Sequence, residues 1–423
     1  MRDSKQFRRI LIPTIIVMAA VVFVIGFQYL DQGKKEPESN GLENDTVTIG
    51  VICPCTRELE AYKFLADLAE QDINKHLNEQ EISQEFKFIV SDAQGDSMNA
   101  FDIAKQHYDS GNKLIVGLSW SSQMDTFFSF AKERGCLIIS PGSTQPWPLR
   151  LAPSTYRLYP ADHLYTVPLV EAVESVNVSK VIFLSLLHAS FADIMREEFI
   201  AEYNGEIIDV QIDSQGTDSE LEQATEVLKD EIQGAINEHG ENHVAVYFIG
   251  ISDHLEKILG STTEDSIFSV PWFVWNGYNW HDDPGTRYTG FEEDASVLSR
   301  IKLIGVHPAI PDNPVFTRIN GLYLERFGEP ISMIHGNLYD GLWITALSVI
   351  QAGSIDGVDV GEKVPEIAKH YVGVSGNCSL NDWGDRWGVD WTLYGYKLEG
   401  NTTKVTQFGL YSYTTGKITW YDN

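Results

Sequence analysis

Residues 113–142 read KLIVGLSWSSQMDTFFSFAKERGCLIISPG. Two short apolar runs, 113–118 and 136–140, enclose a longer segment, 121–134, in which Ser121 or Ser122 can cap a helix. Short continuous apolar runs of this kind are typical of parallel strands that are buried on both faces. The stretch therefore predicts a strand, a helix and a second parallel strand.

The same alternation of strand and helix patterns continues on both sides of this unit. Before it, we expect strands at 46–52 and 86–90 and helices at 61–74 and 97–108. A second series has strands at 181–187, 206–212, 244–249, 272–275 and 303–306, with helices at 191–203 and 220–237. Helices at 315–327 and 338–352 and a hairpin of 391–398 with 405–412 follow. The pattern predicts an α/β protein with two doubly wound, Rossmann-like lobes.

The N-terminus has the composition of a membrane anchor. Residues 10–30 are apolar, and Arg2, Lys5, Arg8 and Arg9 precede them against one Asp3. The run is long enough to span a bilayer, and the positive-inside rule places the rest of the chain outside the cytoplasm. We expect a cytoplasmic segment 1–9, a transmembrane signal anchor 10–30 and a flexible tether 31–45; a cleaved signal peptide is the alternative.

Charge and cysteine content narrow the function classes. The formal net charge is −29, and the six basic and six acidic residues of segment 1–45 cancel, so this charge belongs to the part that follows. Such acidity argues against nucleic acid as a partner. Cys53, Cys55, Cys136 and Cys378 face an oxidising space in this interpretation, which predicts one or two disulfides. Four Asn-x-Ser/Thr sequons fit a glycoprotein outside the cell. The spacing of Cys53 and Cys55 does not suit a zinc site, and neither metal nor cofactor is expected.

Several motifs in a consistent order resemble one family. The stretches that carry the resemblance are Val116–Ser122, Leu137–Pro146, Tyr339–Leu342, Gly373–Gly376 and Asn381–Arg386. They resemble the type I periplasmic solute-binding proteins, in particular the leucine/isoleucine/valine-binding proteins. The resemblance implies three hinge crossings between the lobes, with residues 46–164 plus 306–385 in lobe 1 and 165–305 plus 386–423 in lobe 2.

The resemblance also places the ligand-binding site. Parallel sheets bind ligands beyond the carboxyl ends of their strands, and Ser121, Gly142 and Thr144 fall there by pattern. In the family, the matching positions hold the head group of an α-amino acid. Further candidates are the adjacent Ser143, the aromatic residues Tyr62, Trp120 and Phe191, and Asn276. Asn276 stands where many amino-acid-binding relatives have an acidic residue, so an amide or urea-like ligand competes with an amino acid.

Capture without chemistry is the function that these residues favour. The chain has no Gly-x-Ser-x-Gly, His-Glu-x-x-His or P-loop motif, so it is not expected to be an enzyme. The resemblance implies a small-molecule ligand, hinge closure around it, and an ABC permease as partner in the cell membrane. A sensing ectodomain that signals through another protein is the alternative.

Overall fold

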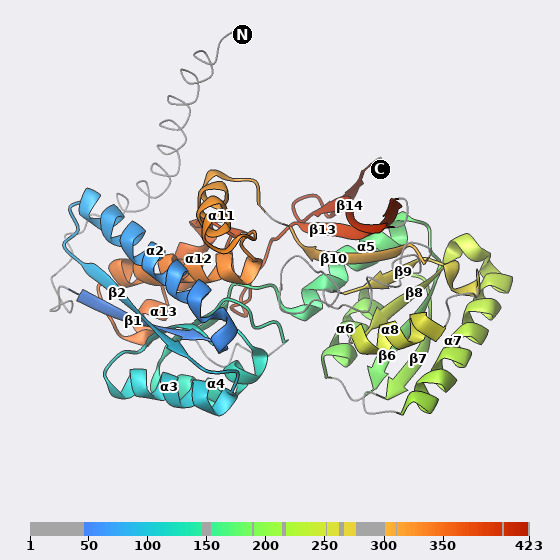
Figure 1. The fold of residues 1–423 in the computed structure, drawn as a ribbon, viewed down its shortest axis with the longest axis horizontal. Helices are drawn as coiled ribbons and strands as arrows, with labels where there is room; N and C mark the ends of the chain where they lie inside the picture. Colours follow the sequence, from blue (N-terminus) through green and yellow to red (C-terminus); the bar gives the residue numbers. More distant parts are fainter. Residues whose placement is uncertain are drawn as a thin grey trace, which may run out of the picture.

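The computed structural model describes residues 46–145, 154–187, 190–213, 217–250, 252–261, 266–275, 301–309, 311–399 and 402–421. Two α/β lobes lie side by side along the longest axis of the molecule (Figure 1). The expected segments 1–9, 10–30 and 31–45 lie outside the described residues. Within the part that is described, no single helix is long and apolar enough to cross a membrane; one bent pair, Met333–Ala352 with Gly357–His370, passes by length and composition.

Lobe 1 is built on a parallel sheet with strand order β2-β1-β3-β4-β5. Its strands are β1 (Thr46–Cys53), β2 (Glu85–Asp92), β3 (Leu114–Gly117), β4 (Leu137–Ser140) and β5 (Thr155–Arg157). Its helices are α2 (Leu59–Glu79), α3 (Ser97–Asp109), α4 (Ser121–Arg134), α11 (Pro314–Phe327), α12 (Met333–Ala352), α13 (Gly357–Gly361) and α14 (Val364–His370). A short ladder of β11 (Val372–Gly373) and β12 (Gly376–Asn377) follows α14.

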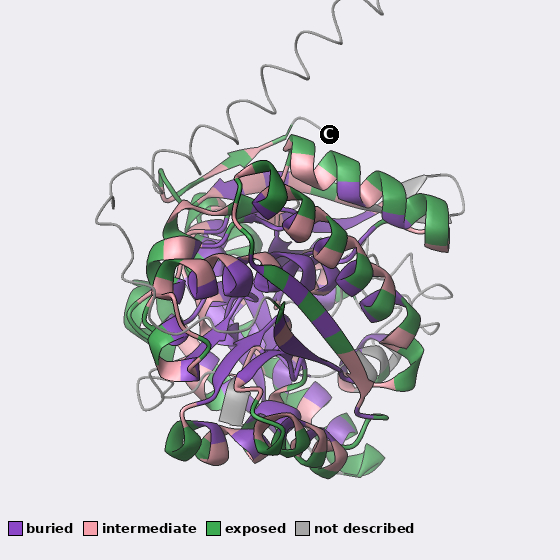
Figure 2. Ribbon diagram, turned by 90° about the vertical axis from the view of Figure 1, so that its left-hand side faces the viewer, coloured by how far each residue is buried: buried purple, intermediate pink, exposed green. Residues whose placement is uncertain are grey.

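Helices cover both faces of this sheet because its strands carry apolar residues on both sides. Along β1, Val51 packs with α2 and α12, whereas its neighbour Ile52 packs with α3 and α4. Figure 2 shows buried strands between helices whose outward faces are exposed. The edge strand β2 alternates between exposed and buried residues in its first half, as a strand with one covered face does.

Lobe 2 repeats this plan and extends it. Its sheet has the order β15-β14-β13-β10-β9-β8-β6-β7. The strands are β6 (Lys180–Leu187), β7 (Glu206–Asp213), β8 (Val244–Ile249), β9 (Trp272–Val274), β10 (Leu303–Pro308), β13 (Trp391–Glu399), β14 (Thr402–Ser412) and β15 (Lys417–Trp420). The helices are α5 (Thr166–Ser175), α6 (Ser190–Glu202), α7 (Asp218–His239) and α8 (Ser252–Ser261). The predicted C-terminal hairpin is confirmed, with β15 as a third antiparallel strand.

The chain passes between the lobes three times. The first crossing joins β5 to α5, the second joins β10 to α11, and the third joins β12 to β13. The boundary expected at 305/306 is corrected, because β10 continues to Pro308 and pairs with β9 and β13 of lobe 2. Lobe 1 therefore resumes only after Pro308. The boundaries expected at 164/165 and 385/386 fall within the first and third crossings.

The expected disulfides are contradicted. All four cysteines lie among the described residues and all four are free thiols. Cys53 packs with the α2 and α12 side of the lobe 1 sheet, whereas Cys136 packs on the opposite side. The Cys53 thiol instead donates a hydrogen bond to the backbone carbonyl of Cys55 at 3.1 Å. The sheet itself thus separates Cys53 from Cys136.

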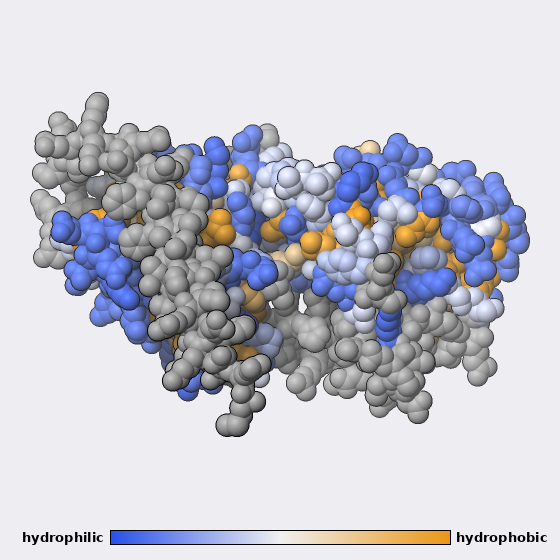
Figure 3. Space-filling model, turned by 90° about the horizontal axis from the view of Figure 1, so that it is seen from above, coloured by the Kyte–Doolittle hydropathy of each residue, from blue (hydrophilic) through white to orange (hydrophobic). Residues whose placement is uncertain are grey.

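The outer surface reflects the acidic composition of the chain. Among the coloured residues of Figure 3, hydrophilic side chains dominate both lobes and hydrophobic ones form small separate patches. The chain has 60 acidic and 31 basic residues. Charged surfaces of this kind keep a protein soluble and say little about the ligand.

Candidate ligand-binding site

The topology of lobe 1 places a candidate binding edge at the carboxyl ends of its strands. β1 is the first strand, and the chain proceeds from it to β2 on one side and to β3 and β4 on the other. In doubly wound sheets, ligands bind where the strand order reverses, beyond the carboxyl ends of the strands. The candidate site of lobe 1 is therefore formed by the loops that follow β1, β3 and β4.

The loop after β3 has an unusual backbone conformation. Leu118 is fully buried and has a φ of 55°, a region that residues other than glycine seldom occupy. The hydroxyl of Ser140 holds it there, since it donates to the Leu118 carbonyl at 3.0 Å. Strained backbone of this kind persists where surrounding contacts fix it, and it is found often at binding sites.

Tyr62 packs against this loop through Ser119. Its ring is fully buried, and its hydroxyl is 2.5 Å from the Ser119 hydroxyl. The ring also meets His335 edge to face. We expected Tyr62 as a ligand contact; in this structure the packing of α2 against the sheet buries it, and its contact with a ligand stays a prediction. Its position suits support of the β3 loop from below.

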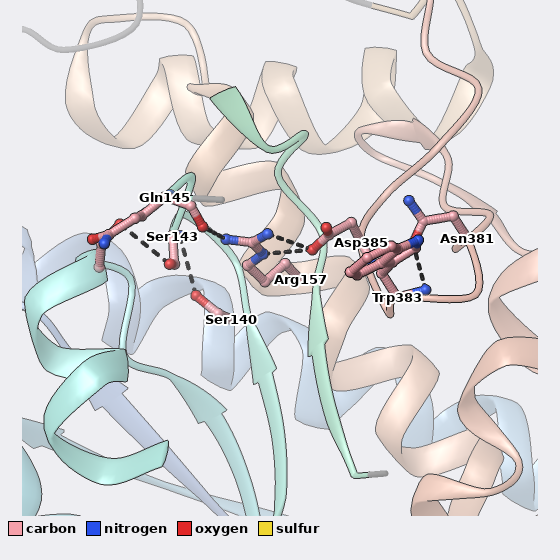
Figure 4. Close-up of polar contacts among 8 residues, drawn as sticks. Ser140, Ser143, Gln145, Arg157, Asn381, Trp383 and Asp385 are labelled. Carbon is pink, nitrogen blue, oxygen red and sulfur yellow. Dashed lines mark hydrogen bonds and ion pairs between the residues drawn. The ribbon is translucent and has the colours of Figure 1, made fainter. Parts of the chain in front are cut away.

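The loop after β4, residues 141–145, packs tightly against the loop after β3. A Cβ atom on Gly142 would lie 3.0 Å from the Ser119 carbonyl oxygen, so only glycine fits without movement. The Ser143 N–H donates to Ser140 Oγ at 3.2 Å, and the Gln145 N–H donates to Ser121 Oγ at 3.2 Å. Figure 4 shows this arrangement. The structure thus brings Ser121, Gly142 and Ser143 together.

Ser121 does not cap its helix, which corrects one expectation. The N-cap of α4 is Trp120, whose backbone is extended and whose side chain makes no capping bond. The Ser121 hydroxyl instead accepts from Gln145 and lies 3.3 Å from the Ser143 hydroxyl. The first N–H groups of α4 have no acceptor within the helix and can meet an anionic group. Trp120 is 41% exposed at the same edge.

Thr144 is bonded to the first crossing. Its carbonyl accepts from the Asp162 N–H at 2.8 Å, and its hydroxyl hydrogen-bonds the Asp162 carboxyl. Asp162 is 4% exposed, and burial raises its pKa to about 7, while Thr144 and Arg157 act in the opposite direction. Because its carbonyl and hydroxyl both bond to Asp162, contact between Thr144 and a ligand stays a prediction.

The loop after β1 is fixed by a short polar chain. The Glu58 carboxylate lies 3.0 Å from His335 Nε2, and the other ring nitrogen of His335 is 3.0 Å from the Tyr323 hydroxyl. The hydrogen bond with His335 holds the pKa of the Glu58 carboxyl below its usual value. These contacts connect the N-terminus of α2 to α11 and α12, so helices support this side of the site.

The lobe 2 half of the site remains a prediction. The carboxyl ends of β6, β8 and β9 form the corresponding edge, and its strand order reverses between β6 and β8. Asn276 lies outside the described residues, as do Asp282 and Asp283. Phe191 lies on α6, but its side chain is outside the description. Trp275, at the end of β9, donates through its indole N–H to the Gly250 carbonyl at 3.2 Å.

Sequence reasoning missed the residues of the crossings and of α12 that hydrogen-bond the loop of 141–145. These are Arg157, Asp162 and Asn337, together with the roles of Asp385 and Arg386. The Asp385-Arg386 dipeptide is part of a stretch that carries the family resemblance, but the motif does not show its contacts. The available signal was the presence of charged residues close to the predicted crossings, because such residues are buried only when they are paired.

One group of side chains has ligand atoms spaced for a metal ion. Glu206, Glu238 and His239 meet on the surface of lobe 2. The Lys180 ammonium lies 3.2 Å from both carboxylates and so neutralises part of their charge. The group is therefore accounted for as an ion-pair network, away from the candidate site.

Comparison with known proteins identifies the family. The receptor family ligand binding region matches residues 66–399. The chain belongs to this family. An uncharacterized protein of Methanocaldococcus jannaschii is 22% identical over 408 residues, which cover 90% of this chain and 93% of that protein. The ligand-binding-region family consists of ligand-binding proteins, and its matched range includes the loops after β3 and β4 of the candidate site.

Solved structures share the fold of this ligand-binding region. A leucine binding protein of Thermotoga maritima has a TM-score of 0.61 at 17% identity, over 85% of this chain and 97% of that one. An ABC transporter substrate-binding protein of Desulfitobacterium hafniense, in complex with Leu, has a TM-score of 0.63 at 16% identity, over 85% and 100%. The resemblance to type I periplasmic solute-binding proteins is confirmed.

Proposed function

We propose that the protein is the solute-binding component of an ABC importer of the branched-chain-amino-acid type. The observation that carries the proposal is the edge of the lobe 1 sheet, where Ser121 and the loop of 141–145 meet beside the N-terminus of α4. Backbone N–H groups and hydroxyls at such an edge suit a carboxylate or another small polar acceptor. The leucine-bound relative of the same fold supports an amino acid as the ligand class.

The mechanism is hinge closure without chemistry. The three crossings connect the lobes, and a ligand that touches both lobes favours the closed form by its differential affinity. In this proposal, residues 10–30 anchor the protein in the cell membrane with its lobes outside the cytoplasm, and a permease recognises the closed form. Asn276 keeps an amide or urea-like ligand in competition with an amino acid.

Thermal-shift measurements on the full chain test the proposal. The panel contains the common amino acids, small amides and urea, with Ser121→Ala as the site variant. Ser129, exposed on the same helix, provides the matched control Ser129→Ala. A stabilising compound whose effect is lost in Ser121→Ala and kept in Ser129→Ala supports the site. An equal response of both variants contradicts the site.

A sensing ectodomain is the second candidate, because the matched family is described as a receptor ligand-binding region. The two functions share the site and differ in the partner. Permease and ATPase genes beside this one favour import, and a signalling gene in their place favours sensing.

A further inference from the structure

Both ends of the loop formed by residues 141–145 are fastened to the third crossing through two neighbouring residues, Asp385 and Arg386. At the C-terminal end, Arg157 donates to the Gln145 carbonyl and to Asp385 Oδ1, the latter at 2.7 Å from Nε (Figure 4). At the N-terminal end, Asn337 donates to the Pro141 carbonyl at 2.9 Å and accepts from Arg386 at 2.8 Å. One dipeptide thus holds the loop at two points.

These contacts are buried, so they are costly to break. Arg157, Arg386 and Asn337 are fully buried, and Asp385 is 2% exposed. Loss of one partner from a buried charged pair leaves the other without compensation. Arg386 also donates to the Leu158 carbonyl, at 3.1 Å, which lies at the start of the first crossing. The loop and two of the three crossings therefore share one polar network.

The third crossing is shaped to present this dipeptide. The Asn381 side chain accepts from the N–H groups of Trp383 and Asp385, at 2.9 and 3.0 Å, and closes a tight turn. Gly384 completes it with a φ of 82°, and its carbonyl accepts from the Arg157 N–H at 2.9 Å. The turn and β5 therefore lie side by side at the hinge.

We infer that Arg157 and Asn337 are positioning residues that couple the conformation of loop 141–145 to the third crossing, and hence ligand contact to lobe closure. The inference rests on the proposed function for its ligand. A movement of the third crossing can reach the loop through Asp385 and Arg386, and through the bond of Gly384 to Arg157. Conversely, a ligand that orders the loop favours one arrangement of the crossing. The loop and the crossing are coupled in both directions because they share one network.

Hydrogen exchange of the ligand-free full chain tests the coupling independently of any ligand. In Arg157→Gln, we expect amides of residues 142–145 to exchange at least tenfold faster, together with those of 381–386, while β3 and β1 keep their protection. Arg196→Gln is the matched control, since Arg196 is ion-paired to Asp209 at 2.6 Å in lobe 2. Unchanged exchange in both segments, or an equal rise throughout lobe 1, overturns the inference.

Two further arms complete the experiment. Should Arg157→Gln fail to fold, Arg157→Lys and Asn337→Ser probe the two ends of the loop separately, because lysine cannot reproduce the planar fork of arginine. Small-angle scattering with L-leucine as probe then follows closure. If neither leucine nor any panel compound changes the scattering of the wild type, this result counts against the proposed function alone. A variant that closes with leucine as fully as the wild type, at equal affinity, overturns the coupling.

Discussion

The hydroxyl oxygen of Ser121 accepts a hydrogen bond from the backbone N–H of Gln145 at 3.2 Å. This bond joins the first turn of α4 to the end of the loop after β4, across the two strands whose carboxyl ends form the candidate site. The residue that pattern and resemblance select for ligand binding therefore also organises the site before any ligand arrives. Its removal has two measurable effects.

Ser121→Ala is expected to lower the free energy of unfolding by about 1 kcal/mol, because the Gln145 N–H loses its acceptor. Ligand affinity is expected to fall about tenfold or more, since a donor at the site is lost as well. Urea unfolding and calorimetric titration measure the two effects. Ser129→Ala should leave both unchanged, and equal affinities of the two variants would contradict the role of Ser121.

Asp162→Asn is expected to change the pH dependence of stability. Burial raises the pKa of the Asp162 carboxyl to about 7, so the folded state holds a proton that the unfolded state releases near pH 4. The contribution of Asp162 to stability therefore falls as pH rises from about 4 to 7 and is constant above. Asparagine stays neutral and keeps an oxygen acceptor for Thr144.

The measurement for Asp162 is the difference in urea midpoint between Asp162→Asn and wild type at pH 5 and pH 8. The groups that face this carboxyl are Thr144, Arg157, Tyr165 and Tyr247. The urea midpoint of Asp162→Asn should rise relative to that of the wild type on going from pH 5 to pH 8. A difference that stays constant over this range would mean that Asp162 does not titrate there.

Gly384→Ala is expected to destabilise lobe 1 by more than the cost of its backbone conformation. The added Cβ would lie 2.8 Å from the Thr155 carbonyl oxygen, in addition to the strain at a φ of 82°. Gly328 is the matched control, with a φ of 79° and no atom within 4 Å of the added Cβ. Equal losses of melting temperature in the two variants would contradict close packing of the third crossing on β5.

The free cysteines predict a simple pattern of thiol reactivity. Burial raises the pKa of the Cys53 thiol to about 12 and that of Cys136 to about 11, so both are protonated at neutral pH. In the folded chain, only the half-buried Cys55 should react readily with a thiol reagent, and all four should react after unfolding. A reductant should not alter the melting temperature. Fewer than four thiols in the unfolded, unreduced protein would indicate a disulfide.

Much of the architecture follows from local sequence pattern. The strand Val244–Ile249 was predicted with its observed bounds, because a buried parallel strand is a continuous apolar run between polar segments. The helix Met333–Ala352 begins five residues before the predicted Leu338, since Ser332 caps it through the His335 N–H and apolar periodicity does not reveal that start. Short elements such as β5 carry too few residues for a periodic signal.

The site was less accessible to sequence reasoning, because its contacts join segments far apart in the chain. Strand ends place Ser121 and Gly142 at one edge of the sheet, where the Ser121 hydroxyl lies 3.3 Å from that of Ser143 and Gly142 packs against Ser119. The burial of Tyr62 depends on how α2 packs, and the partners of Asp385 lie 228 residues away at Arg157. Cysteine count favoured disulfides, but all four thiols are free, and the sheet lies between Cys53 and Cys136.

The most direct test of ligand capture by closure is small-angle X-ray scattering of the full chain with any compound that the thermal-shift panel selects. We expect a ligand at about its wild-type Kd to reduce the radius of gyration of the wild type, and to reduce that of Ser121→Ala less at the same concentration. A ligand that stabilises the wild type while its radius of gyration stays the same would contradict closure of the two lobes around it.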